Sequence, residues 1–388
     1  MQQGFNPQIL SEDVQKYINA NLQTDLHSLL LKKSPFGDVT MSEIVQQIKG
    51  RNVAARKFPF LLTDGIVFPP NLNLEQASSQ ATAEFKSQDL RGNAFLDLTA
   101  GFGVDAYFLS QNFDEVTLVE QNDVLSETVK HNWQVLGRKA NFCKESLESF
   151  LARNSGPFDL VYLDPARRDQ DKNKKFLLGD LSPNLLEIHD KLLQISRRII
   201  IKLSPLIDIS YLISVLTHIT KIQIIAVRND VKELLVFISP DAGSKDVEIS
   251  CVNLESDEAG FNFNFAEEKS AVPVYSEPLA YLFIPNNSVL KSGAFSLISE
   301  KFGLRKLHPN SHFYTSDSPV TDFPGRMLKV ERIDSKQIKK GEKFNIISKN
   351  YPLSPDEIKK KYKISDGGEN YLIFTQTING KVILKSSE

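Results

Sequence analysis

Apolar and polar residues follow two different patterns along the chain. Over residues 7–49 the apolar side chains recur at helical spacing, as in Val14, Ile18 and Leu22. Over residues 93–240 short apolar segments alternate with helical stretches. The first pattern predicts a small helical region at the N-terminus, and the second predicts βαβ units built around a parallel sheet.

Two segments connect these regions. Residues 57–70 contain two short apolar runs around an Asp-Gly pair and end in two prolines, which predicts a short hairpin or loop. Residues 74–86 have the composition of one helix, although their small polar side chains are unusual for a core helix. A helix-capping role is the simplest interpretation of Ser78 or Ser79.

Seven apolar segments are predicted to be the strands of the sheet: residues 94–98, 115–119, 140–143, 160–163, 199–202, 221–227 and 234–238. Only residues 228–233 separate the last two segments. A parallel pair needs a crossover of about a dozen residues or more, so these two strands are expected to be antiparallel. This layout differs from the six-stranded domains that bind nicotinamide dinucleotides.

The pattern becomes less regular after residue 240. Residues 241–246 have the composition of a linker, a strand-like alternation follows over 247–265, and a helical stretch is expected over 286–302. The final part contains many Lys and Arg residues. Its predicted elements are strands at 325–330, 342–346, 371–375 and 381–384 and a helix at 354–362. These elements predict an α+β tail.

The segment from Asp97 to Gly103, with the sequence DLTAGFG, joins the first predicted strand to a helix. Gly101 and Gly103 allow positive φ angles or the close approach of a ligand. A loose match to G-x-G-x-x-G/A makes a dinucleotide the first cofactor to consider. Asp97 argues against it, because its charge would repel a pyrophosphate but attract the sulfonium and ammonium groups of S-adenosylmethionine. The loop therefore favours the methyl donor, with NAD as runner-up.

Two further acids follow the next two predicted strands. Glu120 closes the second strand, where a carboxylate is placed to accept hydrogen bonds from ribose hydroxyl groups. Glu145 follows the third strand and is a candidate partner for an adenine amino group. The alternatives stay open at this point: a solvated acid at a strand end for Glu120, and an ordinary acid at a helix start for Glu145.

The fourth predicted strand ends in Asp164, Pro165, Ala166 and Arg167. Ligands bind outside the carboxyl ends of parallel strands, so this segment is expected to face the methyl group of the cofactor. Asp164 before Pro165 gives a rigid hydrogen-bond acceptor that suits an amine nucleophile. Arg167 is a candidate to hold a phosphate or to stack on a base, and surface salt bridges are the alternative.

Composition narrows the classes of partner. The 388 residues include 41% hydrophobic and 24% charged residues, with a net charge of −2 and a pI near 6.4, so binding of nucleic acid would rest on a local basic patch. Cys143 and Cys251 lack companions at metal-ligand spacing, which argues against a zinc site or disulfide scaffold. No apolar run reaches the roughly 18 residues of a membrane span, and no signal peptide is evident. We therefore expect a cytoplasmic protein without a metal or a membrane partner.

Two motifs carry a family resemblance. The segment from Asp97 to Gly103 resembles the first motif of class I S-adenosylmethionine-dependent methyltransferases. The Asp-Pro-Ala-Arg segment resembles the fourth motif of amino-group methyltransferases, but Ala166 replaces a proline and Arg167 replaces an aromatic ring. The whole chain is similar to a bacterial family of methyltransferases with a THUMP-like C-terminal domain, distantly related to trimethylguanosine synthases. Residues 74–86 resemble the helix before the first motif in those relatives.

The resemblance implies a Rossmann-like, seven-stranded methyltransferase domain over residues 91–242. A helical N-terminal region would cover 1–90, and an α+β region would cover 243–388. Within that region the family has a ferredoxin-like piece, at about 275–320 here, and a THUMP-like piece, at 321–388. THUMP-type domains imply RNA, most often tRNA, as a partner.

The leading hypothesis is an S-adenosylmethionine-dependent methyltransferase that acts on a base of rRNA or tRNA. Its cofactor site would comprise Asp97, Thr99, Ala100, Gly101, Gly103, Glu120 and Glu145. Its catalytic site would comprise Asp164, Pro165 and Arg167. Two alternatives remain: a methyltransferase acting on a protein or small molecule, and a cofactor-binding protein without activity. The RNA species, the modified atom and the oligomeric state stay open at this stage.

Overall fold

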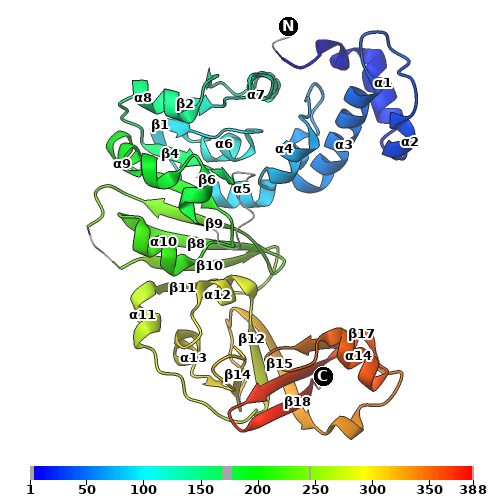
Figure 1. Cartoon of the computed structure of the whole chain (residues 1–388), viewed down its shortest axis with the longest axis vertical. Helices are drawn as coiled ribbons and strands as arrows, with labels where there is room; N and C mark the ends of the chain where they lie inside the picture. Colours follow the sequence, from blue (N-terminus) through cyan, green and yellow to red (C-terminus); the bar gives the residue numbers. More distant parts are fainter. Residues whose placement is uncertain (1–3, 168–176, 244–245, 387–388) are drawn as a thin grey trace. The chain divides into compact units, whose positions relative to one another are not determined.

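The computed structural model describes residues 4–167, 177–243 and 246–386. Figure 1 shows the course of the chain. Its residues form two units: Met1–Thr220 with Leu235–Lys245, and Lys221–Leu234 with Asp246–Glu388. The division therefore runs through one hairpin of the chain as well as through the linker near residue 245.

The N-terminal residues form helices, as their spacing predicts. These elements are η1 (Pro7–Leu10), α1 (Glu12–Ala20), α2 (Leu26–Leu30) and α3 (Met41–Lys57). Helix α3 begins at a capping box, in which the side chains of Thr40 and Glu43 each accept a hydrogen bond from the other's backbone N–H. The apolar faces of these elements pack together around Ile18, Leu29 and Ile44, which are fully buried.

Of the two forms predicted for residues 57–70, the structure has the loop. It contains one short helix, η2 (Pro59–Leu61), and no strand. The backbone of Val67 exchanges two hydrogen bonds with the side chain of Asn132, at 2.9 and 2.8 Å. The backbone N–H of Phe68 donates to the Gln47 side chain at 2.8 Å. No hairpin is needed, because side chains satisfy the backbone groups that a second strand would have satisfied.

The prediction of one helix over residues 74–86 is wrong. The structure has two helices, α4 (Asn71–Gln76) and α5 (Gln80–Ser87). The helix is interrupted because Ala77 and Ser79 have extended backbones, with ψ angles of 148° and 157°. The hydroxyl of Ser79 caps α5 by accepting a hydrogen bond from the N–H of Thr82 at 3.2 Å.

All seven predicted strands of the central sheet are present. They are β1 (Gly92–Asp97), β2 (Phe113–Val119), β3 (Asn141–Cys143), β4 (Leu160–Leu163), β7 (Ile199–Leu203), β8 (Ile219–Val227) and β9 (Asp230–Ile238). Their spatial order is β3-β2-β1-β4-β7-β9-β8. The pairs β1–β2, β1–β4, β2–β3 and β4–β7 are parallel, so the carboxyl ends of these strands lie along one edge of the sheet. The predicted α/β fold class is confirmed.

Helices connect the parallel strands: α6 (Val104–Leu109), α7 (Asp123–Val135), α8 (Leu147–Arg153), α9 (Leu185–Ile195) and α10 (Ile209–Val215). Two-residue strands β5 (Ala166–Arg167) and β6 (Leu181–Ser182) form a separate small sheet, with η3 (Leu178–Asp180) before β6. Every residue of β4 and β7 is buried. Their nearly continuous apolar sequence is typical of strands covered on both faces.

Strands β8 and β9 are joined by a two-residue turn. Its residues, Arg228 and Asn229, have positive φ angles of 49° and 66°. Such turns match the twist of a hairpin, which confirms the predicted antiparallel pair. The turn is shorter than predicted because β9 begins at Asp230, four residues before the predicted start of that strand at residue 234, while β8 ends at Val227 as predicted.

Two more strands extend this sheet beyond β8. Strand β10 (Glu248–Leu254) pairs with β8 in parallel, and β11 (Phe261–Asn264) pairs with β10 in antiparallel fashion. The alternation over residues 247–265 predicts strands but does not show where they pair. The sheet therefore has nine strands, of which seven have the order described above.

The C-terminal part contains a seven-stranded sheet with the order β13-β14-β12-β15-β18-β17-β16. Its strands are β12 (Tyr281–Pro285), β13 (Arg305–Lys306), β14 (Tyr314–Ser316), β15 (Gly325–Ile333), β16 (Lys343–Ser348), β17 (Ser365–Thr377) and β18 (Gly380–Ser386). The helical elements are α11 (Phe265–Ser270), α12 (Asn287–Ser292), α13 (Leu297–Lys301), η4 (Ser335–Gln337) and α14 (Pro355–Tyr362). The helical stretch expected over 286–302 is two short helices, because Gly293 ends α12 with a φ of 79°.

Candidate active site

The loop after β1 depends on its two glycines. Gly101 and Gly103 have φ angles of 52° and 75°, a region that other residues rarely adopt. A Cβ on Gly103 would lie 2.7 Å from Cγ1 of Val129, so only glycine fits where α6 packs on α7. A Cβ on Gly101 would meet only the carbonyl oxygen of Thr99, at 3.8 Å. The loop is therefore packed at Gly103 and open to a ligand at Gly101.

Asp97 is a buried carboxylate at the end of β1, with 1% of its surface exposed. It accepts a hydrogen bond from the N–H of Thr99 at 2.8 Å. Burial raises the pKa of Asp97 to about 8, and the nearby negative charges of Asp105 and Asp164 add to the rise. A positive charge next to Asp97 would reverse this shift, so the site favours a cationic ligand.

Glu120 lies after β2 and shapes the same loop. One carboxylate oxygen accepts a hydrogen bond from the N–H of Gly101 at 3.0 Å, and the other accepts one from Asn122 at 2.8 Å. Each carboxylate oxygen has a second lone pair, so Glu120 retains the capacity to accept hydrogen bonds from a ligand. The N–H of Ala100 donates to the carbonyl of Val119 at 3.0 Å, which also ties the loop to the end of β2.

Asp164 lies beside this loop at the carboxyl end of β4. Its N–H donates to the hydroxyl of Thr99 at 2.7 Å, which links the loops after β1 and β4. The side chain of Asp164 keeps 36% of its surface exposed, and Pro165 behind it is buried. The backbone of Asp164 is therefore held by a hydrogen bond, while its carboxylate remains partly accessible to solvent.

Four charged side chains, Lys86, Asp105, Lys202 and Asp164, form what we call the buried ion cluster. Lys86 contacts one oxygen of Asp105 at 2.6 Å, and Lys202 contacts the other at 3.3 Å. Lys202 also contacts Asp164 at 2.5 Å. Positive and negative charges thus alternate from α5, through α6 and β7, to the loop after β4.

Two hydroxyl groups also contact Asp105. Ser78 and Tyr162 each donate a hydrogen bond to its Oδ2, at 2.7 Å. Ser78 in turn accepts hydrogen bonds from Lys86 at 2.8 Å and Lys202 at 3.1 Å. Ser78 lies in the break between α4 and α5, and this position brings its hydroxyl into contact with the cluster.

The pKa values of the two aspartates in the cluster are shifted in opposite directions. Burial alone would raise the pKa of Asp105, but Lys86 and Lys202 outweigh it and hold that pKa well below its usual range. Burial raises the pKa of Asp164 above its usual range, and Lys202 opposes this rise. The two lysines therefore favour the charged form of Asp105, whereas the ionisation of Asp164 depends on its lysine neighbour.

Most residues expected in the site lie together at one edge of the sheet: Asp97, Thr99, Ala100, Gly101, Gly103, Glu120, Asp164 and Pro165. Glu145 forms an ion pair with Arg153 of α8. Its assignment to an adenine amino group stays a prediction. Arg167 pairs through its backbone with Leu181, but its side chain lies outside the described part of the structure, as do Arg168 and the residues up to 176.

Sequence reasoning missed Lys202, which contacts Asp164, and the residues connected to it through Asp105: Ser78, Lys86, Asp105 and Tyr162. One signal was available. Lys202 lies within an apolar strand with the sequence IIIKL, and a lysine is rarely buried unless it is paired. A charged residue in such a strand predicts a partner of opposite charge, although the sequence does not say which residue that partner is.

Within the described residues, no group of three or more His, Cys, Asp or Glu side chains is arranged to hold a metal ion. The described helices include none that combines the length and the apolar character needed to cross a membrane.

Comparisons with known families assign different parts of the chain. Residues 79–184 match a family described as conserved hypothetical protein 95. Residues 281–324 match a ferredoxin-like domain, and residues 325–385 match a THUMP-like domain. Among curated proteins, no sequence matches the chain significantly.

A solved structure resembles the chain over its full length. A crystallised candidate methyltransferase from Porphyromonas gingivalis W83 is 28% identical, covers 99% of this chain and 100% of its own, and superposes with a TM-score of 0.87. The chain has a methyltransferase fold and a THUMP-like C-terminal domain. The resemblance noted in the sequence is thereby confirmed.

Two other structures match only part of the chain. A candidate methyltransferase of Streptococcus mutans in complex with S-adenosylhomocysteine is 14% identical and covers 41% of this chain and 94% of its own, with a TM-score of 0.30. An rRNA methylase of Streptococcus thermophilus is 16% identical and covers 41% and 93%, also with a TM-score of 0.30. Likenesses of this size support no further conclusion.

Proposed function

We propose that this protein transfers a methyl group from S-adenosylmethionine to RNA. The observation that carries the proposal is a concentration of positive charge in a chain with a methyltransferase fold. Residues 325–385, which we call the basic region, contain 14 Lys and Arg against 7 Asp and Glu, a net charge of +7, while the whole chain has −2. Such a local field attracts a polyanion with many phosphates.

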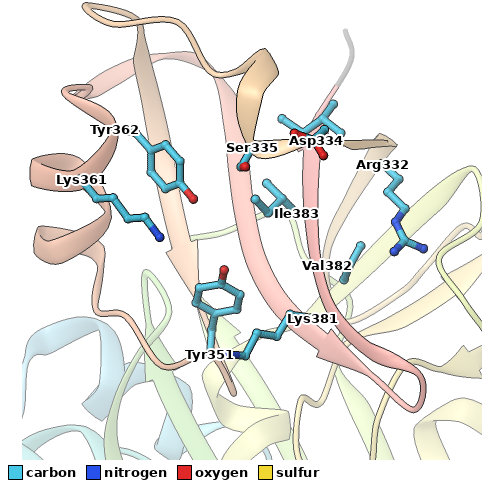
Figure 2. A pocket seen from close by; sticks show the side chains of 10 residues that line it. Arg332, Asp334, Ser335, Tyr351, Lys361, Tyr362, Lys381, Val382 and Ile383 are labelled. Atoms are coloured by element: carbon cyan, nitrogen blue, oxygen red, sulfur yellow. The ribbon is translucent and has the colours of Figure 1, made fainter.

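The basic region contains a pocket that combines cations with aromatic rings. It has a volume of about 490 Å³, and its lining includes Arg332, Tyr351, Lys361, Tyr362 and Lys381. Figure 2 shows the hydroxyl groups of Tyr351 and Tyr362 directed toward each other, with Lys381 and Lys361 beside the respective rings. A ring that stacks on a base beside a cation that binds a phosphate is the usual combination in sites for unpaired RNA.

The two tyrosines of this pocket have fixed positions. Both rings pack on the buried Phe374, with centroid distances of 5.3 Å for Tyr351 and 5.7 Å for Tyr362. Lys381 and Lys361 lie over these rings, 5.8 and 5.4 Å from the respective centroids. The pocket is therefore supported by the core of the domain and is more than a group of flexible surface side chains.

The residues at the β1 loop fit the proposed cofactor. S-adenosylmethionine supplies an activated methyl group on a sulfonium cation. Lys86 and Lys202 balance the charges of Asp105 and Asp164, so an ionised Asp97 would add one negative charge that a cationic ligand neutralises. Glu120 and the open face at Gly101 would hold the nucleoside part.

On the acceptor side, we assign Asp164 and Pro165 to positioning the group that receives the methyl. Asp164 is partly exposed and lies one hydrogen bond from the cofactor loop. A carboxylate there would accept a hydrogen bond from the acceptor and keep it in line for transfer. No metal is needed for this chemistry, because the methyl donor is already activated.

Transfer of a radioactive methyl group tests the proposal. The full chain is incubated with labelled S-adenosylmethionine and RNA from cells that lack the gene, and the RNA is then digested to nucleosides for mass spectrometry. We expect label in a single modified nucleoside of rRNA or tRNA. Label found only in protein or in small molecules would replace RNA with another acceptor. Binding of the cofactor without any transfer would point to a protein that has lost activity.

A further inference from the structure

Lys202 lies between two carboxylates in an otherwise apolar strand. All five residues of β7 are buried, and the side chain of Lys202 has only 10% of its surface exposed. Its ammonium group contacts Asp105 at 3.3 Å and Asp164 at 2.5 Å. Removing a lysine charge from water carries a cost that a purely apolar strand residue would avoid. The position therefore calls for a role beyond packing.

One side of Lys202 is held firmly by the rest of the cluster. Asp105 receives Lys86 at 2.6 Å and the hydroxyls of Ser78 and Tyr162 at 2.7 Å each. The side chain of Lys86 is almost completely buried, with 1% exposed. Asp105 is thus anchored by three side chains besides Lys202, and it contacts the ammonium group of Lys202 at 3.3 Å.

The other side of Lys202 meets the one carboxylate of the cluster that is accessible. Asp164 has 36% of its side chain exposed, against 10% for both Asp105 and Lys202. The fixed charge of Lys202 therefore acts on a group that a substrate can reach. Exposure to solvent therefore rises along the cluster, from the buried Lys86 to the accessible Asp164.

We propose that Lys202 is a positioning residue that keeps the Asp164 carboxylate ionised and aimed at the methyl acceptor, with Lys86 and Asp105 holding Lys202 in place. This inference rests on the proposed function, in which Asp164 accepts a hydrogen bond from the acceptor group. Only an ionised carboxylate offers all its lone pairs to such a donor.

Among the residues that the structure describes, the charges that face Asp164 come from four elements. Lys202 on β7 and Lys86 on α5 favour its ionised form, whereas Asp105 on α6 opposes it. Asp97 on β1 interacts with Asp164 and also opposes its ionisation when it is itself charged. Because burial disfavours the charge as well, loss of Lys202 would move the titration of Asp164 to higher pH.

The test is the pH profile of methyl transfer by the full-length Lys202→Met variant. We expect its acidic limb to move up by at least about one pH unit, and turnover at pH 7 to fall at least about tenfold. Lys202→Arg, which keeps the charge, should restore the position of the limb. The matched control is Lys306→Met, because Lys306 is also buried and lies in the ferredoxin-like match. It should leave the profile unchanged.

Should Lys202→Met fail to fold, Lys202→Gln takes its place, since it removes the charge but keeps a polar side chain. The same upward shift is expected. An unchanged acidic limb in a folded variant, or a uniform loss of turnover at every pH, would overturn the inference.

A second readout does not depend on activity. The carboxyl group of Asp164 can be titrated by carbon-13 NMR in the full chain, with Asp164→Asn identifying its signal. We expect a higher pKa in Lys202→Met than in the wild type, and equal values would contradict the inference. If no acceptor is methylated at all, the proposed function fails, while this titration still decides the role of Lys202.

Discussion

Lysine side chains differ in solvent exposure and in contact partners between two regions of this molecule. In the buried ion cluster, Lys86 and Lys202 have 1% and 10% of their side chains exposed, and each contacts an aspartate. In the basic region, Lys361 and Lys381 are exposed and lie over tyrosine rings at the edge of a pocket. In the proposed function, buried charges would therefore govern the stability and chemistry of the first region, and exposed charges would govern binding of RNA by the second.

The largest effect is expected from removing the centre of the cluster. Asp105→Ala leaves Lys86 and Lys202 without their shared anion, which should cost about 3–5 kcal/mol of unfolding free energy. Urea unfolding followed by fluorescence measures this effect. The only tryptophan, Trp133, lies in α7 of the same unit and reports on it.

The control for this variant is an exposed ion pair. Glu12 contacts Lys16 at 2.6 Å, with 81% and 68% of their side chains exposed. Glu12→Ala should change the unfolding free energy by less than about 1 kcal/mol. If both variants lost the same stability, the contrast between buried and exposed charges would not hold for this protein.

The next effect concerns turnover. Asp164→Ala should lower methyl transfer at least ~100-fold while leaving cofactor affinity within about an order of magnitude, because Asp164 acts on the acceptor. Single-turnover kinetics and calorimetry with S-adenosylhomocysteine provide the two values. An equal loss of both would assign Asp164 to the cofactor site.

A smaller effect is expected from the titration of Asp97. Its pKa of about 8 means that the carboxyl is mostly protonated at pH 6 and charged well above pH 8. A cationic ligand prefers the charged form, so affinity for S-adenosylmethionine should rise at least about tenfold from pH 6 to pH 8. Calorimetry over this range measures the rise, and Asp97→Asn should abolish it. A wild-type affinity that does not change with pH would contradict the assignment.

The smallest effect is expected in the basic region. The double variant Lys361→Gln/Lys381→Gln should weaken RNA binding about three- to tenfold and make the salt dependence shallower by about 1.5 in log–log slope, for two lost phosphate contacts. Fluorescence anisotropy with labelled tRNA at several salt concentrations measures both. Lys32→Gln/Lys33→Gln removes the same charge from exposed positions after α2 and is the matched control. Equal effects of the two variants would mean that the pocket makes no specific contribution.

The α/β fold could be predicted from the sequence because apolar periodicity and strand spacing are local properties. The segments around Leu96, Val161 and Ile200 are apolar at most buried positions, and the short connection at Arg228 indicated the hairpin. The pairing of β10 with β8 could not be predicted, because alternation identifies a strand but not its neighbour.

The residues of the candidate site likewise fall into those whose positions the sequence predicts and those whose positions it does not. Asp97, Glu120 and Asp164 follow strand ends, where parallel strands place ligands, so their positions were predictable. The positions of Lys86 and Ser78 were not predictable, because Lys86 lies in α5 and Ser78 in the break before it, and the approach of both to Asp105 depends on tertiary packing. Lys202 occupied an informative position, but its significance depends on a partner that only the structure identifies.

The most direct test of the account is a comparison of steady-state constants for methyl transfer to RNA in two variants, Asp164→Ala and Lys361→Gln/Lys381→Gln. We predict a lower kcat with unchanged RNA affinity for the first variant, and a higher KM for RNA with unchanged kcat for the second. Loss of the same constant in both variants, or normal RNA methylation by Asp164→Ala, would contradict the division of labour between the buried ion cluster and the basic region.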